Sequence, residues 1–549
     1  MKSKRSLILM ILAFPIFALA QGKTDTSTSA NNIIPKPVSV NLLKGRNVGV
    51  TNATIIFSDD RFTTQEIYLK EQILNQCGLQ LSVQLKRPTK KNTSAIILEY
   101  DSMQVNKPEM YLFMAKNNQV TIKAKDVPGM VHGIETLLQL LPLREIKNAS
   151  ISPVVITDYP RFEYRGMHLD VSRHFFPVDY IKKYIDYLTF YKLNTFHWHL
   201  TDDQGWRIEI KSYPKLTGVG AWRDSTLIGH FRDKPRRYDG IRYGGFYTQE
   251  EVKDVIKYAA IRGITIIPEI DIPGHSRAII ASYPEFSTDP DSTFDVATSP
   301  GMYNWKNNVL APNEKTFTFL KIVFGEIADL FPSPFIHIGG DECSHIWWKA
   351  DPKTQDFMKE HGIKNETALQ TYFMQQVIQD LQLKGKKVIG WDEILEGDLD
   401  TSAIIMNWRG VKAAIQAAKE KHHVIMSPSG YTYFNYSQTK NEDSLTQGGY
   451  LPLEKVYNFE PIPKGLDSVE TKYILGAQGN VWTEYIANKS KLEYMIFPRM
   501  TALSEALWTP ENEKNYADFK RRIKENAIPR FKYWNCNYFK TALPDEKKE

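Results

Sequence analysis

Eight short strand-like runs alternate with helical stretches from Arg161 onward, and this alternation constrains the fold more than any other feature of the 549-residue chain. Strands that alternate with helices build a parallel sheet, and eight such strands close into a (β/α)8 barrel. The runs are residues 166–171, 195–200, 264–270, 335–338, 387–390, 403–406, 423–426 and 473–477. We therefore predict an α/β fold whose larger part is a TIM barrel.

Polar and aromatic residues follow most of these runs. The carboxyl ends of barrel strands form the active-site face, whereas acidic residues scattered over a surface would not concentrate at strand ends. The residues found there are Asp170, Asp202, Asp203, Asp271, Asp341, Glu342, Trp391, Asp392, Trp408, Trp482 and Glu484. The pattern predicts a catalytic site at the mouth of the barrel.

The stretch FIHIGGDEC, residues 335–343, concentrates this chemistry most strongly. Gly339 and Gly340 remove side chains where backbone or ligand must come close, and Asp341 and Glu342 follow directly. A Gly-Gly turn with two solvated acids is the alternative for the motif taken alone. The other strand-end residues favour the catalytic interpretation.

The segments outside the barrel are also readable. Residues 1–20 have a basic start, an apolar centre and an Ala-Leu-Ala cleavage site, which predicts a secretory signal and an exported protein, periplasmic or at the cell surface. Residues 21–32 read as a linker, 33–157 as a small α+β accessory domain, 158–510 as the barrel, and 511–549 as a helical tail packed on it. No later apolar run is long enough to span a bilayer.

Charge and cysteine content exclude several classes of function. The net charge of +6 loses three positive charges with the signal, and the remaining basic residues are spread, so no nucleic-acid footprint is present. Three widely spaced cysteines, Cys77, Cys343 and Cys536, form neither a disulfide framework nor a metal knuckle.

Within the accessory domain we expect strands at residues 54–57, 81–85 and 95–99, a hairpin over 110–123 that turns at Asn117–Asn118, and helices over 64–76 and 130–141. In the barrel, Thr248 to Glu251 form a capping box that opens a helix running to about Gly263.

Tryptophans and carboxylates that converge on one mouth suit a polyol substrate, because apolar sugar faces stack on aromatic rings and hydroxyls need fixed acceptors. One tryptophan alone is more often core, but Trp391, Trp408 and Trp482 stand at three strand ends. Glycoside hydrolysis usually needs two carboxylates, yet Asp341 and Glu342 are adjacent and would point to opposite sides of a regular strand. Either a distant acid is the partner, or the substrate supplies the nucleophile.

A metal-dependent hydrolase is the competing interpretation. His197 and His199 share one face of a strand and could bind zinc, with Asp341 as a further ligand. No histidine stands at the ends of the later strands, so we expect neither metal nor cofactor. We expect His275 near the mouth, where it could tune Glu342 through a shared network.

Six segments in order resemble glycoside hydrolase family 20, the β-N-acetylhexosaminidases, over about residues 162–508. They are HIGGDE at 337–342, FEYRGMHLDVSRHF, HWHLTDDQGWR, PEIDIPGH, the WDE at Trp391, and NVWTE at 480–484. The region before Asp158 is similar, less specifically, to that family's accessory domain.

The resemblance implies an exo-acting, retaining enzyme in which the 2-acetamido oxygen of N-acetylglucosamine or N-acetylgalactosamine attacks the anomeric carbon. It implies that Glu342 is the general acid and then the base. Asp341 would hold the acetamido N–H, Tyr433 would bond its oxygen, and Trp391, Trp408 and Trp482 would wall the pocket. Arg165 and Glu484 would grip ring hydroxyls, and His275 with Asp203 would support the acid.

One position departs from the family pattern. Two residues after the tyrosine the family often has an aspartate, where this chain has Asn435. Loss of that carboxylate suggests tolerance of 6-sulfated sugar, and an amide that makes the same hydroxyl contact is the alternative. A lacto-N-biosidase-like enzyme and a non-catalytic glycan-binding protein are the other interpretations, and a homodimer is expected by analogy alone.

Overall fold

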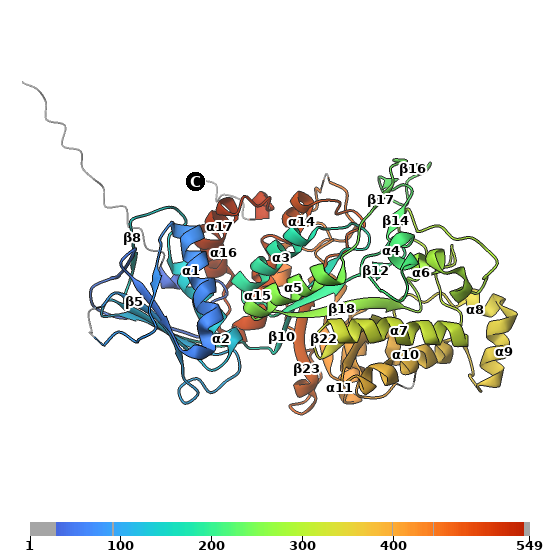
Figure 1. The fold of residues 1–549 in the computed structure, drawn as a ribbon, viewed down its shortest axis with the longest axis horizontal. Coiled ribbons are helices and arrows are strands. Elements are labelled where there is room, and N and C mark those ends of the chain that lie inside the picture. Colours follow the sequence, from blue (N-terminus) through green and yellow to red (C-terminus); the bar gives the residue numbers. More distant parts are fainter. Residues whose placement is uncertain (1–28, 90–92, 398, 443, 543–549) are drawn as a thin grey trace, which may run out of the picture.

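The computed structural model describes residues 29–89, 93–397, 399–442 and 444–542, so the predicted signal and most of the predicted linker lie outside the described residues. The larger body is a closed barrel of parallel strands in the order β10-β11-β18-β19-β20-β21-β22-β23. These strands are β10 (Tyr164–Asp170), β11 (Thr195–His199), β18 (Thr265–Ile272), β19 (Phe335–Gly339), β20 (Lys387–Trp391), β21 (Ile404–Asn407), β22 (Val424–Met426) and β23 (Ile474–Gly479). They match the eight predicted runs and confirm the TIM barrel (Figure 1).

Helices surround the barrel because its strands are buried on both faces; every residue of β10 and β11, for example, is buried. The main ones are α3 (Val178–Phe190), α5 (Gln249–Ile261), α7 (Glu314–Leu330), α10 (Glu366–Leu383), α11 (Val411–Lys419) and α15 (Arg499–Trp508). The predicted capping box opens α5, since Thr248 and Glu251 satisfy each other's backbone N–H groups.

The accessory domain contains a seven-stranded sheet in the order β1-β9-β6-β7-β5-β3-β4. Its strands are β1 (Ser39–Leu42), β3 (Ile55–Ser58), β4 (Ser82–Val83), β5 (Ala95–Tyr100), β6 (Tyr111–Lys116), β7 (Gln119–Ala124) and β9 (Val154–Asp158). The predicted hairpin is β6–β7, and Asn117 and Asn118 take the positive φ values its tight turn needs. Sequence reasoning missed β1, β9 and the separate pair β2 (Val48–Thr51) and β8 (Asn148–Ile151).

Two helices join the accessory sheet to the barrel. The helices α1 (Thr63–Cys77) and α2 (Val127–Leu140) pack on the sheet and also contact α5 and α3 of the barrel. Beside them the buried carboxylate of Asp158 accepts hydrogen bonds from Tyr111 at 2.6 Å, Lys192 at 2.8 Å and Trp508 at 2.8 Å. A charge bonded from both bodies fixes their relative position.

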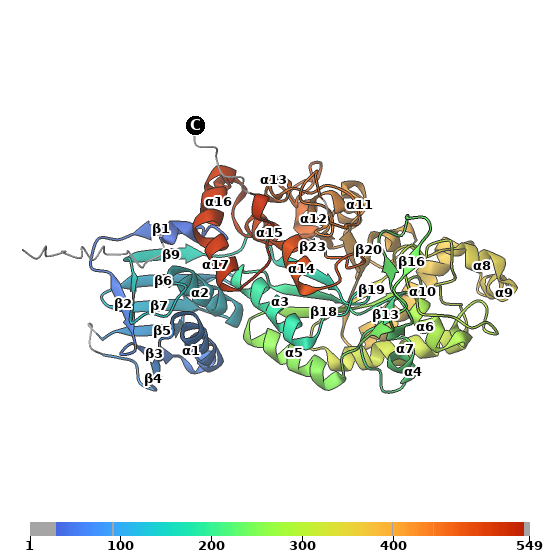
Figure 2. The ribbon, with the colours of Figure 1, turned by 90° about the horizontal axis from the view of Figure 1, so that it is seen from above.

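The C-terminal tail packs against both bodies rather than on the barrel alone (Figure 2). It comprises α16 (Tyr516–Arg522), a π-helical turn (Ile523–Ala527) and α17 (Ile528–Tyr533). Arg522 pairs with Glu505 of the barrel, whereas Arg530 donates to Gln76 of the accessory domain at 2.7 Å. Asn526 bonds the carbonyl of Asn32, so the end of the predicted linker is packed in place.

Among the described residues, no helix is both long and apolar enough to cross a membrane.

Candidate active site

A cavity of about 190 Å³ opens at the carboxyl ends of the barrel strands. Its walls combine carboxylates, aromatic rings and amides, the residue types that bind a polyol. The lining residues are Arg173, His275, Asp341, Glu342, Trp391, Trp408, Tyr433, Asn435, Tyr436, Gln447, Trp482 and Glu484. Most of the predicted site residues are among them; Asp203 and Arg165 are not.

The backbone after β19 brings both acidic side chains to one point. Gly339 and Gly340 have φ values of 68° and 96°, and Glu342 itself has a φ of 43°. A side chain at Gly339 would collide with the carboxylate of Asp271, so glycine is required there on two grounds. The regular-strand expectation, with the acids on opposite sides, is therefore wrong: Nε2 of His275 lies 3.6 Å from both Asp341 Oδ2 and Glu342 Oε2.

His275 connects these acids to a second carboxylate behind the pocket. Its Nδ1 lies 3.0 Å from Asp202 Oδ1 and 3.5 Å from Asp203 Oδ2, so Asp202 is the nearer support. Asp203 instead accepts bonds from the backbone N–H of Arg277 and the side chain of Asn308. It supports the loops around His275 more than the ring itself.

Protonation follows from this arrangement. Although burial opposes the charge, Asp202 raises the pKa of His275 well above its usual value, so the ring is cationic. The cationic His275 ring, 3.6 Å away, lowers the pKa of Glu342. Burial raises the pKa of Asp341 to about 6, with the Glu342 charge adding to it and His275 opposing it. Glu342 is therefore ionised, and His275 Nε2, 3.6 Å away, holds a proton that this carboxylate can take up.

The tryptophans are held by buried acids. Trp391 donates its indole N–H to Glu269 at 2.9 Å, and Trp408 donates to Glu393 at 3.0 Å. Burial, with the nearby Asp341 charge, raises the pKa of Glu393 to about 9. The Tyr433 ring stacks beside Trp408 at 6.3 Å between centroids, and Trp482 lies 5.7 Å from Trp391. The rings form one wall around the acids.

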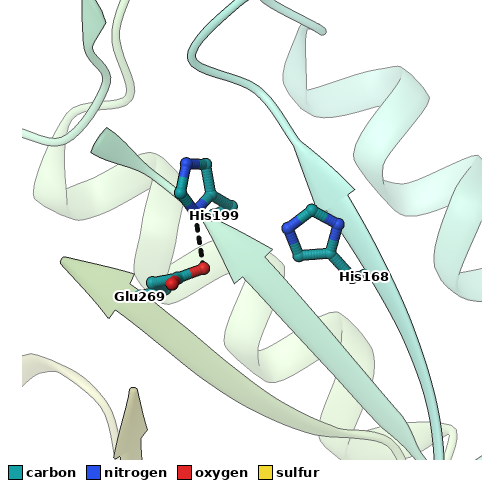
Figure 3. A group of neighbouring side chains, drawn as sticks. All are labelled: His168, His199 and Glu269. Carbon is teal, nitrogen blue, oxygen red and sulfur yellow. Dashed lines mark hydrogen bonds and ion pairs between the residues drawn. The ribbon is translucent and has the colours of Figure 1, made fainter. Parts of the chain in front are cut away.

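Glu269 is the centre of a fully buried histidine cluster inside the barrel. Figure 3 shows Glu269 on β18, with His168 of β10 and His199 of β11 beside it. His199 bonds Glu269 through Nδ1 and Asp202 through Nε2, the latter at 2.9 Å. His197 Nε2 and His337 Nδ1 each lie 3.0 Å from the Glu269 carboxylate. The chain Glu269–His199–Asp202–His275 thus runs from the barrel core to the pocket.

This cluster bears on the prediction that the site binds no metal. Histidines from β10 and β19 join the pair on β11, although sequence reasoning found none at the ends of the later strands, and several described groups have ligand atoms within 4.8 Å of one another. The donor set, however, is already engaged: one oxygen of Glu269 accepts from Trp391 and the other from His199. The hydrogen-bond network accounts for the cluster, and a metal-free site stays a prediction.

Four oxygen atoms in the pocket are buried and have no hydrogen-bond partner among the residues that the structure describes. They are Asp341 Oδ1, Asn435 Oδ1, Gln447 Oε1 and Glu484 Oε2. Buried polar atoms are normally satisfied, so these point to a hydroxyl-rich ligand. Burial raises the pKa of Glu484 to about 7. Sequence reasoning missed Gln447 and Tyr436, which lie in a loop region without periodicity.

The prediction for Arg165 is wrong. It is the second residue of β10, at the end of the barrel away from the pocket, and its guanidinium is fully buried against Glu109 of the accessory domain. Arg173, three residues past the end of β10, lines the pocket and pairs with Asp202 at 2.7 Å. The rule that strand carboxyl ends carry the site would have selected Arg173.

Comparison with known proteins agrees with this geometry. Residues 162–511 match the model of the glycosyl hydrolase family 20 catalytic domain, and residues 30–159 match domain 2 of the same family. A β-hexosaminidase of Porphyromonas gingivalis is 40% identical over 94% of this chain, which spans 65% of that relative's length. A β-hexosaminidase of Vibrio furnissii is 38% identical over 88% of this chain and 77% of its own.

A solved structure supports the same assignment. The exo-β-N-acetylglucosaminidase of Vibrio harveyi, in complex with N-acetylglucosamine, superposes with a TM-score of 0.83 at 36% identity. The alignment covers 93% of this chain and 79% of that one. On the family match over both bodies, the chain belongs to glycosyl hydrolase family 20.

Proposed function

We propose that this chain is an exo-acting, retaining β-N-acetylhexosaminidase that removes terminal N-acetylglucosamine or N-acetylgalactosamine by substrate-assisted catalysis. The observation that carries the proposal is the meeting of Asp341 and Glu342 at one nitrogen of His275. Carboxylates on the same side of a pocket cannot serve as acid and opposing nucleophile. A nucleophile from the substrate resolves that geometry.

The steps follow from the protonation states. Glu342, once it has taken up the proton of His275 Nε2, gives that proton to the glycosidic oxygen as the bond to C1 breaks, and the acetamido oxygen bonds to C1 to give an oxazolinium ion. The Asp341 carboxylate accepts the acetamido N–H and balances the developing positive charge. Burial raises the pKa of Tyr433 well above its usual value, so its hydroxyl stays a donor for the acetamido oxygen. Water then adds to C1 as the bond from C1 to the acetamido oxygen breaks, and the water gives its proton to Glu342.

The binding residues support release of one sugar at a time. Arg173 and Glu484 are placed to bond ring hydroxyls, in the role expected of Arg165 and Glu484, and the tryptophans pack around the ring and the acetamido methyl. A cavity of about 190 Å³ is small beside the ~300 Å³ at which drug-sized pockets begin. That size favours a monosaccharide over the disaccharide that a lacto-N-biosidase-like enzyme releases.

The first experiment compares an aryl N-acetyl-β-glucosaminide with the plain β-glucoside, using wild type, Glu342→Gln and Asp341→Asn. We expect activity only on the acetamido sugar, release of the β-anomer first, a large loss in Asp341→Asn, and a loss in Glu342→Gln that grows as the phenol becomes less acidic. Equal activity on both sugars would show that a protein carboxylate is the nucleophile. Glycan binding without hydrolysis would favour the binding-protein interpretation, and loss of activity with a chelator would favour the metal-dependent one.

The narrower part of the proposal is tolerance of 6-sulfated N-acetylglucosamine. Asn435 lines the pocket with an unpartnered amide oxygen where the family often has a carboxylate, so repulsion of an anionic group is removed. Glu484 lies in the same cavity, and its negative charge would oppose the binding of a sulfate group. Asn435→Asp should lower the ratio of activity on sulfated to unsulfated substrate, and an unchanged ratio would leave the amide as a simple hydroxyl contact.

Export is a separate part of the proposal, supported by the basic and apolar pattern of residues 1–20. Expression in a bacterial host followed by cell fractionation and N-terminal sequencing tests it, since processing after Ala20 is expected. The homodimer stays a prediction by analogy, and sedimentation of the purified chain tests it.

A further inference from the structure

The loop of residues 297–308 carries an exposed aromatic residue that the proposed chemistry does not use. Trp305 is 61% exposed and its neighbour Tyr303 is 51% exposed, although large aromatic side chains usually bury most of their surface. Both belong to the segment of residues 297–308, between β18 and α7. A bound ligand could cover an indole ring in this position.

The segment is fastened to the catalytic machinery at both ends. Ala297 donates its backbone N–H to the carbonyl of Asp203 at 2.9 Å, and Asn308 donates its side-chain amide to the carboxylate of the same residue at 3.0 Å. Asn308 also accepts the backbone N–H of Ser276, the residue that follows His275. The segment is therefore a preformed loop against the support of the catalytic histidine.

The middle of the loop is bonded to the segment that follows the acid. Asn304 accepts a hydrogen bond from Ser344, which is buried two residues after Glu342, at 2.6 Å. Trp305 follows Asn304 directly. A general acid must lie within hydrogen-bond reach of the glycosidic oxygen, and the second sugar is attached to that oxygen. The loop that carries Trp305 is thus bonded to the segment that carries the acid.

A neighbouring loop completes the rim. Arg236 lies over the Trp305 ring at 4.4 Å and donates to the carbonyl of Phe231 at 2.7 Å. The backbone N–H of Phe231 in turn donates to the hydroxyl of Tyr485 at 3.2 Å. Tyr485 follows Glu484 of the pocket, so these contacts connect the loop of Trp305 with one wall of the pocket. The strands β16 (Arg237–Tyr238) and β17 (Tyr243–Gly244) of this loop region project from the barrel in Figure 1.

We propose that Trp305, with Arg236 over one face of its ring, offers the other face as the binding platform for the second sugar of the glycan, on the leaving-group side of the scissile bond. The inference rests on the proposed function. The apolar face of a pyranose would cover the exposed indole, and the guanidinium would donate to its hydroxyl groups. The platform makes a glycan, rather than a glycoside with a small leaving group, the preferred substrate.

The test compares two substrates that differ only beyond the scissile bond, di-N-acetylchitobiose and methyl N-acetyl-β-glucosaminide. An aryl glycoside is unsuitable because its ring could stack on the same indole. Trp305→Ala should lower kcat/KM about ten-fold on the disaccharide and leave the methyl glycoside within about two-fold. Trp305→Phe should recover most of the loss, because it keeps an aromatic face.

Inhibition by free N-acetylglucosamine reports on the pocket alone and should be the same in wild type and Trp305→Ala. Leu383→Ala, which removes an 85% exposed side chain at the end of α10, controls for loss of any exposed apolar group and should change neither activity. Equal losses on both substrates, or none on either, would overturn the platform while leaving the proposed function intact. A wild type that cleaves neither sugar would overturn the proposed function, and the platform with it.

Discussion

His275 Nε2 lies 3.6 Å from the Oε2 atom of Glu342. The ring nitrogen on the other side faces Asp202, and His199 connects Asp202 with Glu269 in the barrel core. Anionic and cationic groups thus alternate from the core to the acid, because Asp202 and Glu269 have lowered pKa values and both histidines have raised ones. The catalytic acid is the exposed end of a buried network, and its properties should depend on it.

Glu342→Gln tests the acid through the leaving group. The variant keeps the shape of the side chain but has no proton to give, so the loss should grow as the leaving group becomes more basic. We expect a fall in kcat of about 10²–10⁴-fold on the disaccharide and a much smaller fall on an aryl glycoside with an acidic phenol. Steady-state rates on a series of phenols measure the slope. A slope equal to that of wild type would show that Glu342 is not the proton donor.

Asp341 predicts the acid side of the pH profile. Its pKa is raised to about 6, and it must be ionised to accept the acetamido N–H. Therefore kcat/KM should fall below about pH 6, by ten-fold per pH unit for one proton. In Asp341→Asn, kcat/KM should be much lower at every pH, and its fall below pH 6 should be absent. Glu484, whose pKa burial raises to about 7, provides the control. Glu484→Gln should weaken substrate binding and leave the fall in kcat/KM near pH 6.

The same carboxylate should cost stability. Because the folded pKa of Asp341 lies above its unfolded value, ionisation is harder in the folded state, and the cost appears as pH rises from about 4 to above 6. Asp341→Asn should then be more stable than wild type by on the order of 2 kcal/mol at neutral pH and equal to it near pH 4. Urea unfolding at both pH values measures the difference.

Asp291→Asn, at an exposed position, controls for the loss of a negative charge and should not change the free energy of unfolding at either pH. Should Asp341→Asn prove no more stable than wild type at neutral pH, the burial argument for its raised pKa would be wrong.

The parts of this molecule that sequence reasoning predicted are those set by local pattern. Each of the eight apolar runs can be recognised from its own residues. The direction of the strands then places the acids that follow them at the mouth of the barrel. The convergence of Asp341 and Glu342 could not be predicted, because it depends on the positive φ values of Gly339, Gly340 and Glu342. A one-residue change in backbone hand reverses which side a neighbouring side chain takes.

Other misses came from distance in the sequence. Arg165 and Arg173 share one family-like segment, and only the position of β10 separates the residue that joins the domains from the one that lines the pocket. The strand β1 pairs with β9, more than a hundred positions away, and its four residues carry little apolar signal of their own. Gln447 reached the pocket from a loop whose course no periodicity reveals.

Glu269→Gln tests the buried hub. The isosteric amide removes the anion that balances His199 and gives the cluster an N–H group in place of an acceptor. Breaking a buried charge pair in this way typically costs ~3–5 kcal/mol. Trp391→Phe is the comparison, since it removes the indole donor to the same carboxylate, worth about 1 kcal/mol, together with the packing of one ring, and leaves the Glu269 charge in place. Thermal unfolding of the two variants compares them, and equal costs would mean that the hub carries no net charge.

The two arginines give the sharpest test of the corrected site. Arg165→Lys should lower stability by about 1–3 kcal/mol, because lysine cannot keep both the Glu109 pair and the bonds to the carbonyls of Phe162 and Lys192. Its KM should equal that of wild type, because the side chain lies away from the pocket. Arg173→Lys should raise KM about ten-fold, because one ammonium group cannot bond the ring hydroxyls and Asp202 in the same geometry.

Kinetics on the disaccharide and unfolding curves, measured on both variants, separate a binding role from a structural one. Arg173 also touches Asp202, so a fall in kcat with a shifted pH profile would reveal its indirect effect on His275, whereas a change confined to KM would reveal contact with the sugar. If Arg165→Lys raised KM as much as Arg173→Lys, the assignment of the two arginines would be reversed. The structure predicts the opposite, since Glu109 and the pocket lie at opposite ends of the same strand.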